Sequence, residues 1–421
     1  MTPDPNNKMS RVAVDIGSTV VKVALLGEGD HLISQEFCPR DFEAGIANQV
    51  KALLVSIGVA LDNPDVLVCS SANGGLQIGI VCLTKRFSGT VFRDQVLLAG
   101  ANPTFICDLD DTSEHLSYVD ILLIGGGIDS VDADPLAERL RRFAPDKYRF
   151  GTLLYAGNKY LAHSFCKLFP KTVVVSNPLG EHLSNATTSV FEVIRRAYLD
   201  DLVYKQGISE LRGNLANGIR PTPEIVNLGF QRAVQRRSSI PIIAPCVLLD
   251  IGGATTDLHY TVEIVHENSE IRPTAASSFA RYVFTDLGIV ASRDTLLLQL
   301  RSHPRLHEFL TTMLTKGVRE AYQLLREGEY EPSRELLSYA CLFLALDRFA
   351  HGRGPDLPTG DLPKIAQIIL TGGAAQGMSE ELVERMIALL LPGKCVKPII
   401  LVDRCYQIWV DGIVCSRHLS V

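Results

Sequence analysis

Residues 247–260 read VLLDIGGATTDLHY, an apolar run followed by an aspartate, two glycines, two threonines and a second aspartate. This pattern predicts a buried strand, a tight turn and a returning strand. At the end of the first strand, the carboxylate of Asp250 can hold a Mg²⁺ ion or a water molecule. Gly252 and Gly253 lack a Cβ, so their backbone N–H groups can close on a phosphate. An ordinary glycine hairpin is the alternative interpretation of this stretch.

The residues after the first glycine extend the same predicted site. Threonine is β-branched and suits a returning strand, and its hydroxyl can donate a hydrogen bond to a phosphate oxygen. We predict that this loop contacts its ligand through Gly252, Gly253, Ala254, Thr255 and Thr256. For Asp257, the next residue, we expect a structural hydrogen bond to the turn.

Two further stretches repeat the pattern. Residues 12–23 read VAVDIGSTVVKV, with an aspartate, a glycine and two hydroxyl residues between two apolar strands. The ligand contacts predicted there are Asp15, Gly17, Ser18, Thr19 and Lys22. Residues 368–376 read IILTGGAAQ, an apolar strand that runs into Gly372 and Gly373. Because one loop covers a phosphate from one side only, the repeat favours two related halves that hold one nucleotide between them.

These motifs resemble the signature of the superfamily that contains actin, heat-shock chaperones and the acetate and sugar kinases. Within it, the chain is most similar to the accessory-protein family of the B12-dependent glutamate mutase operon. These mutase reactivating factors are called MutL and are unrelated to the mismatch-repair protein of that name. The resemblance is carried by DIGSTVVKV at Asp15, CSSANGGLQIGIV at Cys69, YVDILLIGGGIDS at Tyr118, YAGNKY at Tyr155, LLDIGGATTDLH at Leu248, TDLGI at Thr285 and LTGG at Leu370.

The resemblance implies an α/β protein made of two ribonuclease-H-like domains of the actin-like ATPase fold, with an inserted α/β subdomain. ATP would lie in the cleft, Mg²⁺ would be held through Asp15 and Asp250, and one of these carboxylates would orient the attacking water. Slow ATP hydrolysis would then drive release of damaged cobalamin from a B12-dependent mutase, whose subunits would be the partners. The chain has no D-x-H-x-x-G cobalamin signature, so the cobalamin should belong to the partner.

Two other functions use the same loops. A small-molecule kinase of the sugar or acetate type would aim a substrate hydroxyl at the γ-phosphate. An actin-like scaffold would use the nucleotide only to time its assembly. The motifs do not separate these alternatives from a reactivating ATPase, since all three need the phosphate loops.

Composition excludes several other classes of protein. The formal net charge is −6 and no basic run is interleaved with aromatic residues, which argues against a nucleic-acid partner. No apolar run approaches the ~18 residues that a membrane span needs, and residues 1–10 lack the apolar core of a secretion signal. We therefore expect a cytoplasmic protein without a membrane partner. The ten cysteines form no C-x-x-C pair and fit reduced core thiols.

The pattern of elements predicts the domain organisation. Residues 76–180 alternate strands and helices, which is typical of a parallel sheet flanked by helices. In such sheets ligands lie beyond the carboxyl ends of the strands, so this insert could hold a second ligand or a partner surface. The predicted division is residues 1–75, the first half of domain I; 76–180, the insert; 181–245, a helical connection that completes domain I; and 246–421, domain II with a helical segment at 292–350.

Some local expectations concern the second half. A third strand is predicted at residues 262–265, and a final strand pair at 399–402 and 406–410. Asp403 is expected to lie in a surface turn between the strands of that pair. Asp286 and Gly288, in the TDLGI stretch, are weaker candidates for contact with the nucleotide.

Overall fold

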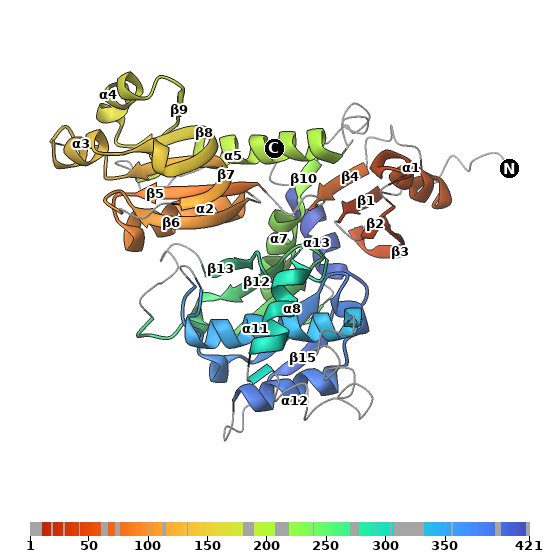
Figure 1. Ribbon diagram of the computed structural model, residues 1–421. Helices are drawn as coiled ribbons and strands as arrows, with labels where there is room; N and C mark the ends of the chain where they lie inside the picture. Colours follow the sequence, from red (N-terminus) through yellow and green to blue (C-terminus); the bar gives the residue numbers. More distant parts are fainter. Residues whose placement is uncertain are drawn as a thin grey trace.

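The computed structural model describes residues 11–417 except 18–19, 28–29, 42, 60–65, 72–75, 100, 112–114, 133, 180–188, 207–218, 239, 270–277, 291, 304, 307–331, 355–356 and 392–396. These residues form three five-stranded sheets. Figure 1 places the sheet near the N-terminus at upper right, the sheet of the insert at upper left and the sheet of the second half below.

The first sheet has the strand order β10-β4-β1-β2-β3. Its strands are β1 (Arg11–Ile16), β2 (Val20–Leu26), β3 (Leu32–Pro39), β4 (Val66–Ser70) and β10 (Ile219–Pro221). β1 runs antiparallel to β2 and parallel to β4, β2 runs antiparallel to β3, and β4 runs parallel to β10. Helix α1 (Ile46–Ser56) packs against β2 and β3. β1 and β4 are buried almost throughout, which is why they read as continuous apolar runs.

The sheet of the second half repeats this arrangement strand by strand. Its order is β13-β12-β11-β14-β15, so the third, second, first, fourth and fifth strands lie side by side as in the first sheet. The strands are β11 (Cys246–Ile251), β12 (Thr256–Thr261), β13 (Phe279–Phe284), β14 (Gln367–Thr371) and β15 (Ile399–Val402). Their directions also match those of the first sheet. The chain therefore has two ribonuclease-H-like units, and the predicted actin-like ATPase fold is confirmed.

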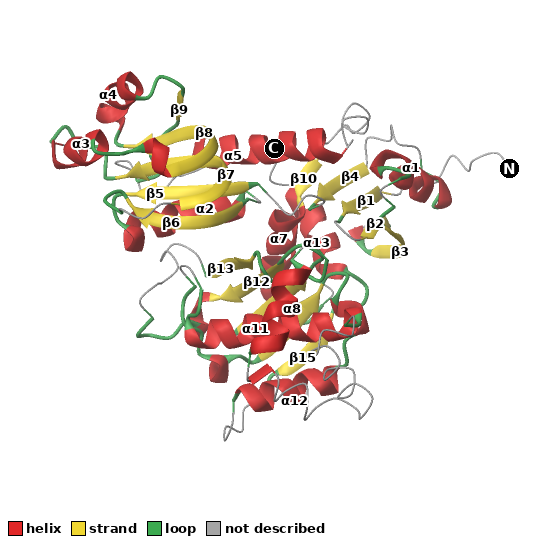
Figure 2. Ribbon diagram, viewed as in Figure 1, coloured by secondary structure: helices red, strands yellow, loops and turns green. Residues whose placement is uncertain are grey.

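Helices cover both faces of the second sheet (Figure 2). One face packs into a core that also takes in residues of α8 (Arg293–Ser302), α11 (Arg334–His351) and α12 (Glu380–Leu390). The other face shares a core with the first sheet through α7 (Thr222–Val234) and α13 (Gln407–Arg417). In this shared core Ala13 of β1 and Leu248 of β11 join the apolar residues of the two helices. The two units are thus joined by a helix pair.

The insert is a separate parallel sheet of order β6-β5-β7-β8-β9. Its strands are β5 (Gln77–Cys82), β6 (Asn102–Asp108), β7 (His115–Gly126), β8 (Tyr148–Gly157) and β9 (Thr172–Val174). Helices α2 (Thr90–Leu98), α3 (Asp134–Arg141) and α4 (Lys159–Leu168) connect them, and α5 (Ser189–Gln206) follows. The strand and helix alternation predicted here is present, and the boundaries between the domains stay predictions.

The helix pair α7 and α13 crosses at two glycines. A Cβ built on Gly229 would lie 1.8 Å from the carbonyl oxygen of Ile408, and one on Gly412 would lie 1.8 Å from that of Ile225. Only glycine lets the two backbones approach this closely.

We expect Gly229→Ala to lower the free energy of unfolding by about 1–3 kcal/mol, because the added methyl group must push α13 away from α7. Urea denaturation of the full chain would measure this. The matched control is Gly377→Ala, since a Cβ there would meet no described atom within 4 Å. Equal stability of the two variants would contradict the tight crossing.

Three local predictions were wrong. Residues Val262–Ile264 form a short 3-10 helix, and the third strand is β13. Residues 406–410 enter helix α13 instead of a strand. Asp403 is buried, and its carboxylate accepts hydrogen bonds from the backbone N–H groups of Gln407 and Ile408 at 2.8 and 3.0 Å. Asp403 therefore caps the start of α13, a role that an apolar run alone did not reveal.

Strand β10 was not predicted, because only three residues form it and one of them is Pro221. Among the described residues, no helix is both long and apolar enough to cross a membrane. The nine described cysteines are all free thiols, and five of them are buried, as expected for core residues.

Candidate functional site

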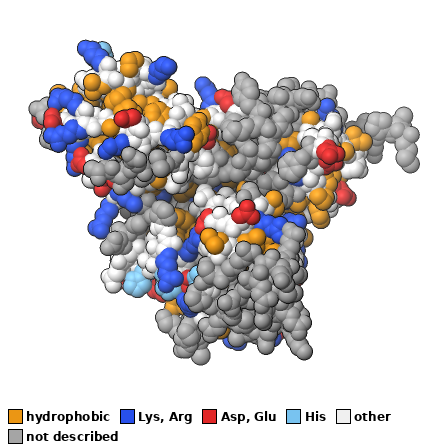
Figure 3. Space-filling model, viewed as in Figure 1, with side chains coloured by type: hydrophobic (Ala, Val, Ile, Leu, Met, Phe, Trp, Pro, Cys, Tyr) orange, Lys and Arg blue, Asp and Glu red, His pale blue; other side chains and the backbone are white. Residues whose placement is uncertain are grey.

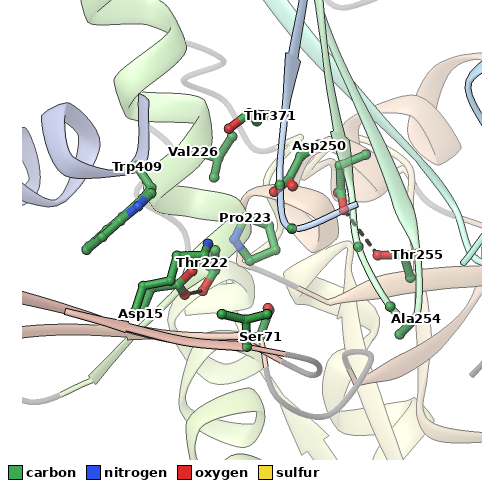
Figure 4. Close-up of a pocket in the computed structure, with 18 of the residues that line it drawn as sticks. Asp15, Ser71, Thr222, Pro223, Val226, Asp250, Ala254, Thr255, Thr371 and Trp409 are labelled. Carbon is green, nitrogen blue, oxygen red and sulfur yellow. Dashed lines mark hydrogen bonds and ion pairs between the residues drawn. The ribbon is translucent and has the colours of Figure 1, made fainter. Parts of the chain in front are cut away.

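A pocket lies where the β1–β2 turn, the β11–β12 turn and the end of β14 converge. Figure 4 shows Asp15 and Thr222 on one side of it and Asp250, Ala254 and Thr255 on the other. The predicted site residues that line it are Asp15, Gly17, Lys22, Asp250, Gly252, Gly253, Ala254, Thr255, Gly372 and Gly373. Stretches far apart in the sequence thus meet around one space.

Three of the predicted contacts need separate mention. Ser18 and Thr19 lie outside the described residues. Thr256 is fully buried, and its hydroxyl donates to the carbonyl of Leu287 at 2.7 Å. Thr256 does not line the pocket, because on a strand its side chain points to the opposite face from that of Thr255.

The Gly252–Thr255 loop presents its backbone donors to the pocket. The carbonyls of Gly252 and Gly253 accept from the N–H groups of Ile289 and Val290, and that of Ala254 accepts from the hydroxyl of Ser292. In a trans peptide the N–H points opposite to the carbonyl. Because all three carbonyls turn to the segment at 289–292, the N–H groups of Gly253, Ala254 and Thr255 point away from it. Such a row of donors is an anion-binding concavity.

The TDLGI stretch supports this loop from behind. A Cβ on Gly288 would lie 2.3 Å from the carbonyl carbon of Ala254, so only glycine allows the segment to pack there. The side chain of Asp286 does not enter the pocket and forms an ion pair with Arg348 at 2.6 Å. Neither residue lines the pocket, so the weaker prediction of nucleotide contact is replaced by a supporting role for Gly288.

Asp15 is already saturated with donors. Its carboxylate accepts from the ammonium group of Lys22 at 2.7 Å and from the hydroxyl of Thr222 at 2.7 Å. Burial disfavours the charged ammonium of Lys22, but the Asp15 carboxylate outweighs it and the pKa of Lys22 is raised. The ring of Tyr406 adds a cation–π contact, 4.4 Å from the Lys22 nitrogen. Lys22 therefore stays charged and in place at the pocket wall.

The carboxylate of Asp250, in contrast to that of Asp15, lacks hydrogen-bond donors in the described parts of the chain. Among the described residues no group donates a hydrogen bond to its side chain, and it lies opposite Asp257 in the β11–β12 register. Burial and the nearby Asp257 carboxylate raise the pKa of Asp250 to about 7. Gly372, with φ +88°, leaves room for it, since a Cβ there would lie 2.3 Å from Asp250 Oδ1. The structure thus leaves one unpaired carboxylate in the pocket, and it is Asp250.

Asp257 is paired on both sides. It accepts from the hydroxyl of Thr255 at 3.2 Å, which confirms the predicted bond to the turn. It also forms a buried ion pair with Arg281 of β13, whose Nε lies 2.7 Å from Asp257 Oδ1. Arg281 Nη1 donates onward to the carbonyl of Leu97, in helix α2 of the insert, at 2.5 Å. The pocket is therefore connected to the insert through one side chain.

Sequence reasoning missed several residues of the pocket wall, namely Tyr198, Thr222, Arg281 and Trp409. Ser71 also lines the pocket, and it falls in the CSSANGGLQIGIV stretch that carries the resemblance. Thr222 begins α7, and a threonine before a proline at a helix start is a recognisable signal. No sequence signal pointed to Arg281, because Arg281 lies on β13 and the third strand was predicted at residues 262–265.

A family model described as MutL protein matches residues 11–418. The chain belongs to the MutL protein family. A MutL relative, Protein MutL of Clostridium tetanomorphum, is 25% identical over 202 residues, which cover 46% of this chain and 44% of that protein. The match thus spans less than half the length of that relative.

Solved structures resemble this MutL-family chain only distantly. A glycerol dehydratase reactivase has a TM-score of 0.39 at 10% identity, over 98% of this chain and all of the other. A diol dehydratase-reactivating factor has 0.38 at 9% identity, over 97% and 100%. The activator of the 2-hydroxyisocaproyl-CoA dehydratase from Clostridium difficile, with bound ADPNP, has 0.35 at 10% identity, over 98% of each chain. The fold assignment of the MutL-family chain rests on its own strand order.

Proposed function

We propose that this MutL-family chain binds ATP with Mg²⁺ in the pocket and hydrolyses it slowly to reactivate a B12-dependent mutase of the glutamate mutase type. The observation that carries the nucleotide site is the row of three backbone N–H groups at Gly253, Ala254 and Thr255, which lines the same pocket as the unpaired carboxylate of Asp250. Membership of the MutL family supports the mutase as the client.

The residues of the pocket have separate roles in the proposed hydrolysis. The N–H row and the charged Lys22 bind phosphate oxygens, and Asp250 accepts a hydrogen bond from the attacking water and orients it. Asp15 holds Lys22 and Thr222 in position. No covalent intermediate is needed, because phosphoryl transfer is chiefly positioning and neutralisation of charge. The products are ADP and inorganic phosphate.

The residues also fit a magnesium ion. Mg²⁺ is usually held by one or two carboxylates together with phosphate oxygens and water, and Asp250 is a carboxylate without a hydrogen-bond donor among the described residues. No group of three His, Cys, Asp or Glu side chains that could form a closed metal site occurs in the described parts of the chain. When bound, Mg²⁺ neutralises charge on the phosphates. Asp250 would hold it, and Asp15 would contribute only if it released Lys22.

We expect ATP with Mg²⁺ to raise the melting temperature of the chain. A ligand that binds only the folded state stabilises it by RT ln(1 + [L]/Kd), about 2.7 kcal/mol at a hundredfold excess over Kd. Differential scanning fluorimetry with ATP, ADP and a non-hydrolysable analogue would measure the shift. Unchanged melting with all three nucleotides would remove the basis for the nucleotide site.

We expect nucleotide and Mg²⁺ to displace a proton from the pocket below neutral pH. The pKa of Asp250 is raised to about 7 by burial and by Asp257 and Asp15, while Lys22 and Arg281 act in the opposite direction. A bound cation favours the ionised carboxylate, so affinity should fall as the pH drops from 8 to 6 and about one proton should be released at pH 6. Calorimetry in two buffers of different ionisation enthalpy would count the proton. Asp250→Asn is the control, since it should release none from this position.

A further inference from the structure

At the carboxyl edge of the insert's sheet, hydrogen bonds hold the loops that follow the strands together. Asp129, in the loop after β7, accepts hydrogen bonds from the backbone of Lys159 at 2.9 Å and from the amide of Asn177 at 3.2 Å. The amide of Asn158 donates to the carbonyl of Ser130 at 2.7 Å, and that of Asn177 donates to Gly127 at 2.8 Å. The loops after β7, β8 and β9 are thus tied to one another. This is the edge where open parallel sheets place their ligands.

Next to this edge, helix α4 and strand β9 expose apolar side chains. The exposed fractions are 48% for Tyr160, 52% for Leu168 and 45% for Val174. Val173 precedes Val174 on the strand, so its side chain points to the other face of the sheet. Helix α4 buries Phe165 on its inner side, so its outer side needs no apolar residue for folding. β9 pairs only with β8 among the described strands and forms an edge of the sheet. We call the outer side of α4 together with β9 the α4–β9 face.

The same face carries more positive than negative charge. Helix α4 and strand β9 with their connection, residues 159–174, contain three lysines and no Asp or Glu, although the whole chain has a net charge of −6. Lys159 pairs with Asp129 at 3.8 Å, and the other two lysines have no carboxylate partner among the described residues. Lys167 and Lys171 are exposed beside Leu168. Figure 3 shows Lys and Arg side chains and apolar side chains together over the insert at upper left. A basic surface on an acidic protein selects an acidic partner.

We propose that the α4–β9 face docks a protein surface that is apolar at its centre and bordered by carboxylates, and that the client mutase presents that surface. This inference rests on the proposed function and extends it, because it assigns the insert to client binding. Exposed apolar side chains on an ordered surface fit a protein partner, whose apolar groups they can bury. Nucleic acid is disfavoured because its recognition is dominated by phosphate contacts, which three exposed apolar side chains cannot make.

The test compares two double variants with equal changes in charge. The variant Lys167→Glu with Lys171→Glu reverses the charge at two positions of the α4–β9 face. The control, Lys51→Glu with Lys397→Glu, reverses the charge of two exposed lysines outside the insert. The probe is a cobalamin-loaded glutamate mutase holoenzyme, immobilised for biolayer interferometry at two salt concentrations. We expect about a tenfold weaker Kd for the first variant, with a smaller salt dependence, and no change for the second. Leu168→Asp should weaken binding without reducing stability, since Leu168 is half exposed.

Two further probes distinguish other classes of partner, namely vesicles with 30% phosphatidylserine and a 20-base-pair DNA duplex. Binding of the mutase that is equal in both double variants would overturn the proposal, as would absence of mutase binding by the wild-type chain. Preference of the wild-type face for vesicles or DNA would overturn it as well. The ATP-dependent melting shift is recorded for every variant. A normal shift with lost mutase binding locates the defect in docking, whereas loss of the shift in the wild type would contradict the nucleotide site itself.

Discussion

Asp250→Asn should bind ATP with Mg²⁺ yet hydrolyse it roughly 10²–10³-fold more slowly than the wild type, a loss typical of removing one preorganised electrostatic contact. The substitution keeps the size of the side chain and one acceptor oxygen, so the loop and Gly372 can hold their positions. The lost charge is the one that would orient the water. Since orientation matters in the transition state, kcat should fall more than nucleotide affinity, which should drop only to the value that the wild type has when Asp250 is protonated. Single-turnover hydrolysis and calorimetric affinity would measure the two effects separately.

Asp250→Asn should also change the pH dependence of the free energy of unfolding, because the pKa of Asp250 is raised on folding. A carboxyl group whose pKa is raised on folding contributes its stability fully below its unfolded pKa and loses it as the pH rises through the folded value, here about 7. Asparagine resembles the protonated form, so Asp250→Asn should be more stable than the wild type at pH 8 and nearly equal to it below pH 4. Asp257→Asn, its neighbour in the register, should instead be less stable, because it leaves Arg281 unpaired. Wild-type hydrolysis by Asp250→Asn would show that another group orients the water.

The sequence was sufficient for the parts of the site that depend on local backbone chemistry. The two D-I-G turns and the Gly372 turn lie where they were predicted, because a glycine after a buried strand leaves few alternatives. The repeat of apolar strands around these turns also predicted two related units. The strand order of the two sheets bears this out.

The parts that could not be predicted depend on contacts between distant segments. Thr256 and Thr255 are adjacent and chemically identical, and only the strand geometry sends one into the core and the other into the pocket. Residues 406–410 read as a strand because they are mostly apolar, yet the cap from Asp403 starts a helix there. The distinction between the saturated Asp15 and the unpaired Asp250 arises from Thr222 and Lys22. Thr222 lies more than two hundred positions from Asp15 in the sequence.

Arg281→Gln should lower the free energy of unfolding by about 3–5 kcal/mol, as expected when one member of a buried ion pair is removed. Arg281 is 7% exposed and is bound to Asp257 and to the carbonyl of Leu97, so its loss leaves a buried carboxylate and a buried carbonyl without their donor. Urea denaturation would measure the change. The control is Arg385→Gln, which breaks an exposed pair with Glu381 on α12 and should cost about 0.5 kcal/mol or less.

A double-mutant cycle separates the ion pair from the contact with the insert. Asp257→Asn combined with Arg281→Gln removes both charges, so it should be less destabilising than the sum of the two single changes. Arg281→Lys keeps the charge beside Asp257 but lacks the planar fork that reaches Asp257 and Leu97 at the same time. Hydrogen exchange in α2 should therefore increase in Arg281→Lys even where the ion pair persists. If exchange in α2 is unchanged in both Arg281 variants, the bond to Leu97 does not connect the pocket to the insert.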